Sequence, residues 1–385
     1  MRLFSFLLFS LFSLTSYAAG FDTQAKYAII VDDTGVVLLE KEADTASPPS
    51  SMSKLMTTYI VFEQLKKGSL KLDDTLFVSE RAWKMQGTKM FIDPNSRVRV
   101  EDLLRGVIVQ SGNDACVVLA EGVMGSEDLF VMEMNKKAAA LGLKHSHFTN
   151  VSGWPDPGHE MSVRDLAILA KRLMEDFPEY YHYFGEREYS YNNIRQPNRN
   201  TLLFSDAGVD GLKTGHTDIG GYGVVVSAKR GERRLIIVVN GLKNQSIRHA
   251  EVEHLLQYGF QRFTQHTIFK PGDVITEAKT WLGRKAALPL TVTVPVKLTL
   301  EGNDSHYQII AKYKEPLLAP IDKGQEVGTL EVSYTLAGHS YEALYPLIAA
   351  EAVEKKPFII RLFEKARYVF KQLRGKEKEH TTLAQ

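Results

Sequence analysis

The sequence predicts an α+β domain built on an antiparallel sheet, followed by a small all-β domain and a C-terminal amphipathic helix. Helical patterns dominate between residues 51 and 174, whereas strand patterns separated by turns begin at residue 221. After about residue 265 the chain alternates apolar and polar residues, notably in 290–300, 307–313 and 328–334. With 385 residues, 44% of them hydrophobic, the chain can bury the cores of two domains.

The first 18 residues have the pattern of a secretory signal peptide. Met1 and Arg2 precede an apolar stretch from Leu3 to Leu14, and Ser16 to Ala18 has the small-x-small form of a cleavage site. An uncleaved membrane anchor is the alternative, but the run is shorter than the ~20 residues that span a bilayer. We therefore expect a mature chain that begins near Ala19, outside the cytoplasm.

The first domain is expected to contain both strands and helices along the chain. Two β-rich runs flank the turn at 32–35 and predict a hairpin. The prolines at 48–49 end the extended chain, and Ser50 or Ser51 can cap a helix that runs to Gly68. The remaining expected elements are helices at 102–109, 114–121, 129–141 and 163–174, strands at 222–228 and 234–240, and a helix at 250–260.

Three short strings carry the residue types of an acyl-transfer site. They are Ser51-Met52-Ser53-Lys54, Ser111-Gly112-Asn113 and Lys213-Thr214-Gly215. The first two arise readily by chance, but the three together in this order are far more specific. Their separations leave room for the helices and strands that would bring three distant segments together.

The first string supplies a nucleophile and its base. A serine hydroxyl is a poor nucleophile until another group takes its proton. Ser51 and Lys54, three residues apart at a helix start, lie on one face, so the lysine can reach the serine. To act as a base Lys54 must be neutral, which requires burial and a nearby cation to lower its pKa from about 10.4. We expect Lys213 to be that second cation.

The other two strings complete the expected site. The Ser111 hydroxyl can relay a proton, and the Asn113 amide can both donate and accept hydrogen bonds. Residues 210–217 read as a strand edge, where Gly215 permits an extended peptide to approach the backbone. Backbone N–H groups of Ser51 and His216 could form an oxyanion hole there.

Further residues of the third segment are expected to meet a carboxylate. These are Lys213, Thr214 and Thr217. A catalytic role for the His216 imidazole is not favoured, because no aspartate partner is evident and Lys54 already supplies the base.

Charge and cysteine content exclude some function classes. A formal net charge of +1 gives no bulk basic field for nucleic acid. The single cysteine, Cys116, cannot form an intrachain disulfide, and its apolar, helix-like surroundings predict a small buried core residue rather than a catalytic one.

The chain closely resembles the low-molecular-mass penicillin-binding proteins of the D-alanyl-D-alanine carboxypeptidase type, which belong to the penicillin-recognising serine enzymes. The resemblance rests on residues 48–57, 110–116, 196–200 and 210–217 and extends over nearly the whole mature chain. It implies a β-lactamase-like catalytic domain at 22–263, a small all-β domain at 266–350 and a membrane-anchoring helix at 355–376. It also implies periplasmic action at the inner membrane.

The resemblance assigns roles residue by residue. It implies Ser51 as the acylated nucleophile, Lys54 as its base, Ser111 and Asn113 as the second element, and Lys213 as a substrate-binding lysine. It also implies that Arg248 helps to hold the terminal carboxylate of the substrate. Whether Arg199 contributes to the site stays open. The implied reaction removes the terminal D-alanine from peptidoglycan pentapeptides through a serine ester, without a metal or organic cofactor, and β-lactams would acylate the same serine.

Other functions on this fold stay open at this point. A β-lactamase of class A holds its deacylating water with a glutamate, and Glu160 is the nearby candidate. A D,D-endopeptidase and a catalytically silent penicillin-binding scaffold are the remaining alternatives.

The C-terminal segment predicts a helix that lies on a membrane surface. Drawn as a helix, 357–374 places apolar residues along one stripe with lysines and arginines at its border, which suits an interface with anionic lipid. The segment is too charged to span a bilayer. A helix docked on its own β domain is the alternative, because the stripe also fits a protein surface. The apolar members are Ile359, Phe363, Ala366, Val369, Phe370 and Leu373.

Overall fold

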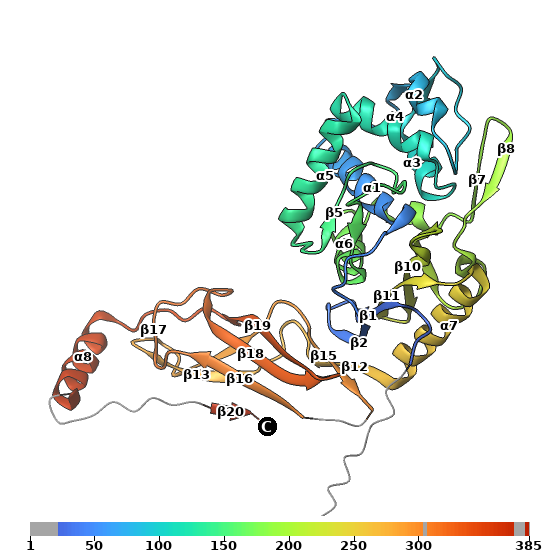
Figure 1. Ribbon diagram of the computed structural model, residues 1–385. Helices are drawn as coiled ribbons and strands as arrows, with labels where there is room; N and C mark the ends of the chain where they lie inside the picture. The colour runs from blue at the N-terminus through green and yellow to red at the C-terminus, as the bar shows by residue number, and fades with distance from the viewer. Residues whose placement is uncertain (1–21, 303–305, 373–381, 385) are drawn as a thin grey trace, which may run out of the picture.

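The computed structural model describes residues 22–302, 306–372 and 382–384. It contains a lobe of helices and sheet, followed by an elongated all-β part that ends in helix α8 (Figure 1). The expected signal peptide at 1–18 lies outside the described residues. The α+β class with a trailing all-β part is confirmed.

The first lobe is organised around a five-stranded antiparallel sheet. Its strands lie in the order β2-β1-β11-β10-β9. Strand β1 of the N-terminal hairpin thus pairs with β11, which comes some 200 residues later, and β9 forms the edge opposite to β2. The strands are β1 (Tyr27–Asp32), β2 (Val37–Lys41), β9 (Val209–Thr217), β10 (Gly221–Arg230) and β11 (Arg233–Leu242).

Both faces of this sheet are buried, which explains its long apolar runs. Ile29 and Ile236 pack into the core around α1, whereas Ile30 and Ile237 face α7 and the β domain. Alternate residues of a strand point to opposite faces, so one strand contributes to two cores. Helices α6 and α7 accordingly lie on opposite faces of the sheet (Figure 1).

The helices agree with the sequence in type and differ at their ends. The first begins as a 3-10 turn, η1 (Ser50–Ser53), and becomes α-helical only at Lys54. The last begins at Gln245, five residues before its expected start, because the Asn244 side chain caps it by accepting the N–H of Ile247. The bounds are α1 (Lys54–Lys66), α2 (Glu80–Lys84), α3 (Val100–Ile108), α4 (Asn113–Met124), α5 (Glu127–Leu141), α6 (Val163–Asp176) and α7 (Gln245–Arg262).

Short strands and 3-10 helices lie around the periphery of this lobe. They are β3 (Thr75–Phe77), β4 (Arg97–Arg99), β5 (Ser146–His147), β6 (Glu160–Met161), η2 (Tyr181–Gly185), β7 (Glu188–Tyr191), β8 (Ile194–Pro197) and η3 (Thr201–Phe204). The β7–β8 hairpin projects from the lobe and returns the chain at residues 198–200, which lie beside β9 (Figure 1).

The all-β part consists of two groups of strands. In the first, β12 (Phe263–Phe269) pairs with β15 (Val296–Glu301). In the second, seven strands lie in the order β17-β13-β14-β19-β18-β16-β20. These strands are β13 (Thr276–Trp281), β14 (Ala287–Thr291), β16 (Tyr307–Tyr313), β17 (Leu317–Leu318), β18 (Glu326–Leu336), β19 (His339–Ala349) and β20 (Thr382–Ala384).

Polar contacts join the two parts, and one of them is buried. The carboxylate of Asp32, at the tip of the first hairpin, accepts the hydroxyl proton of Thr299 in β15. The N–H of Val37 donates to the Tyr341 hydroxyl at 3.0 Å, and Gln265 donates to Asp33 at 2.7 Å. The β domain therefore sits on the sheet edge that is opposite to β9.

Helix α8 (Phe358–Gln372) extends from the far end of the β domain (Figure 1). Within the described part of the chain, no helix combines the length and apolar character that crossing a membrane requires.

Candidate active site

The first string folds into a turn that places its lysine beneath its serine. Ser51 lies in η1, and Lys54 opens α1 with its side chain fully buried. The Nζ atom of Lys54 donates to Ser51 Oγ at 2.9 Å, to Asn113 Oδ1 at 2.7 Å and to the backbone carbonyl of Ser152. The buried amine of Lys54 thus forms hydrogen bonds with the candidate nucleophile, with the second string and with the loop that contains Ser152.

The second string forms a tight loop before α4. Ser111 has a φ of 60°, in the left-handed region that favours glycine. The Thr88 hydroxyl donates to the Ser111 carbonyl, and the Asn113 backbone N–H donates to the Thr88 carbonyl at 2.8 Å. The Asn113 side-chain amide donates to the Gln86 carbonyl at 2.7 Å, which orients its oxygen toward Lys54. Residues 86–88 therefore hold the string in place.

Gly215, the glycine of the third string, lies in close contact with the turn that carries Ser51. A Cβ atom at Gly215 would lie 2.8 Å from the Pro49 carbonyl oxygen and 3.1 Å from Met52. The missing side chain therefore lets β9 pack directly on η1. We expected it to make room for a peptide, and the contacts show that it makes room for the turn that carries Ser51.

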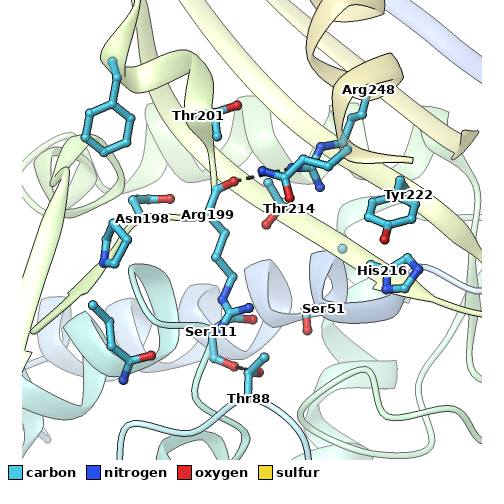
Figure 2. A pocket seen from close by; sticks show the side chains of 15 residues that line it. Ser51, Thr88, Ser111, Asn198, Arg199, Thr201, Thr214, His216, Tyr222 and Arg248 are labelled. Atoms are coloured by element: carbon cyan, nitrogen blue, oxygen red, sulfur yellow. Dashed lines mark hydrogen bonds between the residues drawn. The ribbon is translucent and has the colours of Figure 1, made fainter. Parts of the chain in front are cut away.

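A cleft of about 660 Å³ opens between these elements (Figure 2). Six of the predicted site residues line it, and three others lie buried. Those lining the cleft are Ser51, Ser111, Thr214, Gly215, His216 and Arg248. The buried residues are Lys54, Asn113 and Lys213.

Thr217 does not join this cleft. Its hydroxyl lies 3.0 Å from Ser50 Oγ and accepts the Gly220 backbone N–H, and it lines a second cavity instead. Thr217 sits on the same side of β9 as Lys213 and Gly215, because residues two apart in a strand share a face. The expectation that Thr217 meets a carboxylate beside Thr214 is therefore not supported by its position.

Burial depresses the pKa values of both lysines. Loss of water lowers the pKa of Lys54 to about 8, and the charge of Arg199 adds to this shift. Burial, followed by the charges of Lys54 and Arg199, holds the pKa of Lys213 well below its usual range. The cation that lowers the pKa of Lys54 is Arg199 and not the expected Lys213, whereas the charge of Lys54 does lower the pKa of Lys213.

Two arginines approach the cleft from the β9 side. Arg248 is 6% exposed and donates to the carbonyls of Arg199 at 3.4 Å and Gly223 at 3.5 Å. Among the residues that the structure describes, no carboxylate forms an ion pair with Arg248, and burial lowers its pKa to about 10. Arg199 crosses the cleft toward Ser111, where its Nε donates to the Gln110 carbonyl at 3.3 Å (Figure 2).

Comparison with known proteins agrees with this geometry. Residues 14–244 match the model of the D-alanyl-D-alanine carboxypeptidase family, and residues 263–355 match that of the penicillin-binding protein 5 C-terminal domain. The D-alanyl-D-alanine carboxypeptidase DacC of Escherichia coli is 40% identical, and the match covers 95% of this chain and 94% of that protein. The chain belongs to the D-alanyl-D-alanine carboxypeptidase family.

The chain is also similar to solved structures of penicillin-binding proteins. Penicillin-binding protein 5 from Haemophilus influenzae is 36% identical with a TM-score of 0.76, over 87% of this chain and 98% of that one. Penicillin-binding protein D2 from Listeria monocytogenes, solved in an ampicillin-bound form, is 29% identical with a TM-score of 0.58, over 63% and 99%. The predicted family, fold and serine-type carboxypeptidase activity are thereby confirmed.

In this carboxypeptidase the structure adds residues that sequence reasoning missed. The Ser152 carbonyl and the Thr88 hydroxyl act through backbone contacts, which no motif records. Tyr222 stacks on His216 with ring centroids 3.8 Å apart. Over the described residues, no carboxylate hydrogen-bonds to the His216 ring.

Cys116 lies where its surroundings predicted. It is fully buried in α4, and burial raises the pKa of its thiol to about 12. A thiol of this kind stays protonated and unreactive at neutral pH.

Proposed function

We propose that Ser51 is the residue that this carboxypeptidase acylates, with Lys54 as its base. The observation that carries the proposal is the buried Lys54 Nζ, 2.9 Å from Ser51 Oγ with a depressed pKa. Lys54 takes the hydroxyl proton while Oγ bonds to the carbonyl carbon of the penultimate D-alanine. The C–N bond then breaks, and the departing D-alanine amine receives a proton relayed by Ser111. Water hydrolyses the resulting ester.

The end of the cleft beside Thr214 and Arg248 suits the terminal carboxylate of the substrate. Lys54, Lys213, Arg199 and Arg248 surround the cleft. The terminal carboxylate of the substrate would supply the anionic partner that Arg248 lacks among the described residues. A buried guanidinium that pairs with no carboxylate among the described residues favours an anionic ligand, because ion pairing offsets the cost of its desolvation.

The forming oxyanion is assigned to the backbone N–H groups of Ser51 and His216. Ser51 lies in the first turn of a helical segment, where N–H groups lack intrahelical partners. His216 lies on β9, the outer strand of the sheet, against which an extended peptide can add as a further strand.

Labelling locates the nucleophile. The purified protein is treated with a fluorescent penicillin and digested, and the adduct is located by mass spectrometry. We expect it on Ser51 and expect Ser51→Ala to take no label. Hydrolysis of diacetyl-Lys-D-Ala-D-Ala by the unlabelled enzyme completes the test. A label on another residue, or undiminished labelling of Ser51→Ala, contradicts the assignment.

The structure argues against the β-lactamase alternative. Glu160 is exposed and lines the second cavity, and it is not among the residues that line the cleft that holds Ser51. No glutamate stands among the described residues that line that cleft. A silent scaffold would be labelled by penicillin without turning over the peptide, so the peptide assay tests this alternative. A D,D-endopeptidase would also cleave cross-linked dimers, so it is tested with a cross-linked dimer as the substrate.

We further propose that the mature protein acts in the periplasm and that α8 binds the membrane surface. Its apolar side chains face solvent, with exposures of 70% for Phe358, 68% for Ile359 and 73% for Phe363. The contact of Tyr368 with Trp281 and the Lys356–Glu364 ion pair hold only part of the helix. In this arrangement 22–263 catalyses, 266–350 is a spacer or an interaction module, and 355–376 anchors the chain. The predicted stripe residue Leu373 lies outside the described residues, as does the Phe370 side chain.

A further inference from the structure

The backbone of residues 198–201 brings Arg199 to the catalytic cleft. At its far end the Arg199 side chain is fixed by a long hydrogen bond, 3.3 Å from its Nε to the Gln110 carbonyl. An arginine side chain has many rotamers, and a bond of this length restrains them weakly. The position of the guanidinium therefore depends on how residues 198–201 are anchored.

Two buried asparagines anchor this segment on one side. Asn198 Nδ2 donates to the Glu186 carbonyl at 3.0 Å, and Asn200 Nδ2 donates to the Gly211 carbonyl of β9 at 3.1 Å. The Oδ1 atom of Asn198 also accepts the backbone N–H of Asn200 at 2.9 Å. These bonds fix the segment to β9 and to the turn between η2 and β7.

A hydrogen bond between Thr201 and His249 joins the other side of the segment to α7. Thr201 Oγ1 lies 2.8 Å from His249 Nδ1. His249 directly follows Arg248, whose guanidinium reaches the Arg199 carbonyl over a longer distance of 3.4 Å. Thr201, Arg199 and Arg248 all line the cleft (Figure 2). Two neighbouring residues of α7 thus contact this segment, and His249 makes the shorter of the two bonds.

Glu253 orients the His249 ring. His249 Nε2 lies 3.4 Å from a carboxylate oxygen of Glu253, one turn further along α7. An ionised carboxylate only accepts hydrogen bonds, so Nε2 carries a proton, and Nδ1 of the neutral ring accepts the Thr201 hydroxyl. The helix that carries both residues is firmly seated, because Leu255 and Leu256 are buried in the core beneath the sheet. The pair is therefore built on a rigid support.

We propose that Thr201 and His249 are a positioning pair, whose hydrogen bond holds the Arg199 guanidinium across the cleft that contains Ser51. The pair acts through Arg199, whose charge lowers the pKa of Lys54. When the bond is lost, the guanidinium samples positions farther from Lys54, and the lysine holds its proton more tightly. This inference rests on the proposed function, because it concerns the protonation of the proposed base.

The pH dependence of penicillin acylation tests the pair. Thr201→Val keeps the shape of the side chain and removes the hydrogen bond. We expect the midpoint of the rise in acylation rate to move up by about 0.3–1 pH unit, because two charges about 10 Å apart near a protein surface shift each other's pKa by roughly this amount. The midpoint does not depend on the fraction of active protein, so partial unfolding of the variant would not produce this shift.

Further variants locate the effect. Thr201→Ser keeps the hydroxyl and should keep the wild-type midpoint, whereas His249→Leu should move the midpoint as Thr201→Val does. Thr201→Val should add no further shift to Arg199→Gln, because both changes act on the same charge. Thr264→Val is the matched control. It breaks a Thr–His hydrogen bond of 2.9 Å to His266 within β12, in the all-β part, and should leave the midpoint unchanged.

The outcomes separate this proposal from the proposed function. An unshifted midpoint in Thr201→Val or His249→Leu overturns the pair and leaves the proposed function intact. A shift in Thr201→Ser equal to that in Thr201→Val overturns the pair as well, because the hydrogen bond would then not be its cause. A wild-type enzyme that is not labelled on Ser51, or whose acylation does not rise with pH, would instead refute the proposed function.

Discussion

The Nζ atom of Lys54 lies 2.7 Å from Oδ1 of Asn113, so the second string directly holds the amine of the first. The same nitrogen lies 2.9 Å from Ser51 Oγ. A buried amine that must lose its proton is stabilised in place by acceptors, while burial lowers its affinity for the proton. Hydrogen bonds to Ser51 and Asn113 thus fix the position of the Lys54 amine, whereas its burial lowers its pKa.

Replacing Lys54 by alanine should abolish acylation. The variant loses the base while Ser51 keeps its place in η1, and loss of proton transfer costs about 10²–10⁴-fold in rate. Stopped-flow measurement of penicillin acylation gives the rate. Lys67→Ala, an exposed lysine at the end of the same helix, should acylate normally. Near wild-type acylation by Lys54→Ala would exclude the lysine as base.

The acylation rate should rise as the pH increases through about 8. Lys54 acts as a base only when neutral, and burial with the Arg199 charge lowers its pKa to about 8, so the neutral fraction grows over that range. Arg199→Gln removes one lowering charge and should move the rise to higher pH. Arg195→Gln, an exposed hairpin arginine, should not shift it. An unchanged pH profile in Arg199→Gln would remove this arginine from the control of Lys54.

Arg248→Ala should weaken the handling of peptides that end in a free carboxylate. A charge-assisted hydrogen bond contributes roughly 1.5–3 kcal/mol, which corresponds to about a 10- to 150-fold loss in kcat/KM. The free acid and its C-terminal amide are compared in both proteins. Arg262→Ala, on the same helix but paired with Glu301, is the control. The same acid-over-amide preference in Arg248→Ala and wild type would place the carboxylate elsewhere.

A chain that ends at Glu354 should lose binding to anionic liposomes and keep its activity on small soluble peptides. The truncation removes α8, whose apolar side chains are exposed, and leaves the cleft untouched. Co-sedimentation with vesicles measures binding, which should weaken with salt as the screening length falls from about 10 Å at 0.1 M. Vesicle binding that persists in the truncated chain would assign the anchor to another surface.

Local sequence determined the elements and the first half of the site. The spacing of Ser51 and Lys54 brings them together within one turn, and alternating apolar residues predict strands, because both features depend on neighbours along the chain. Helix ends were less predictable. Asn244 moved the start of α7 by capping it, a contact that a hydrophobic pattern does not record.

Tertiary structure decided which residues share the cleft and why. Gly215 is needed for packing against Pro49, Thr217 turns toward Ser50, and Arg199 reaches Ser111. Each of these relationships joins segments more than 80 residues apart in sequence. The residue types of the site could therefore be predicted from short strings, whereas their neighbours and pKa values could not, because burial and charge depend on segments that only folding brings together.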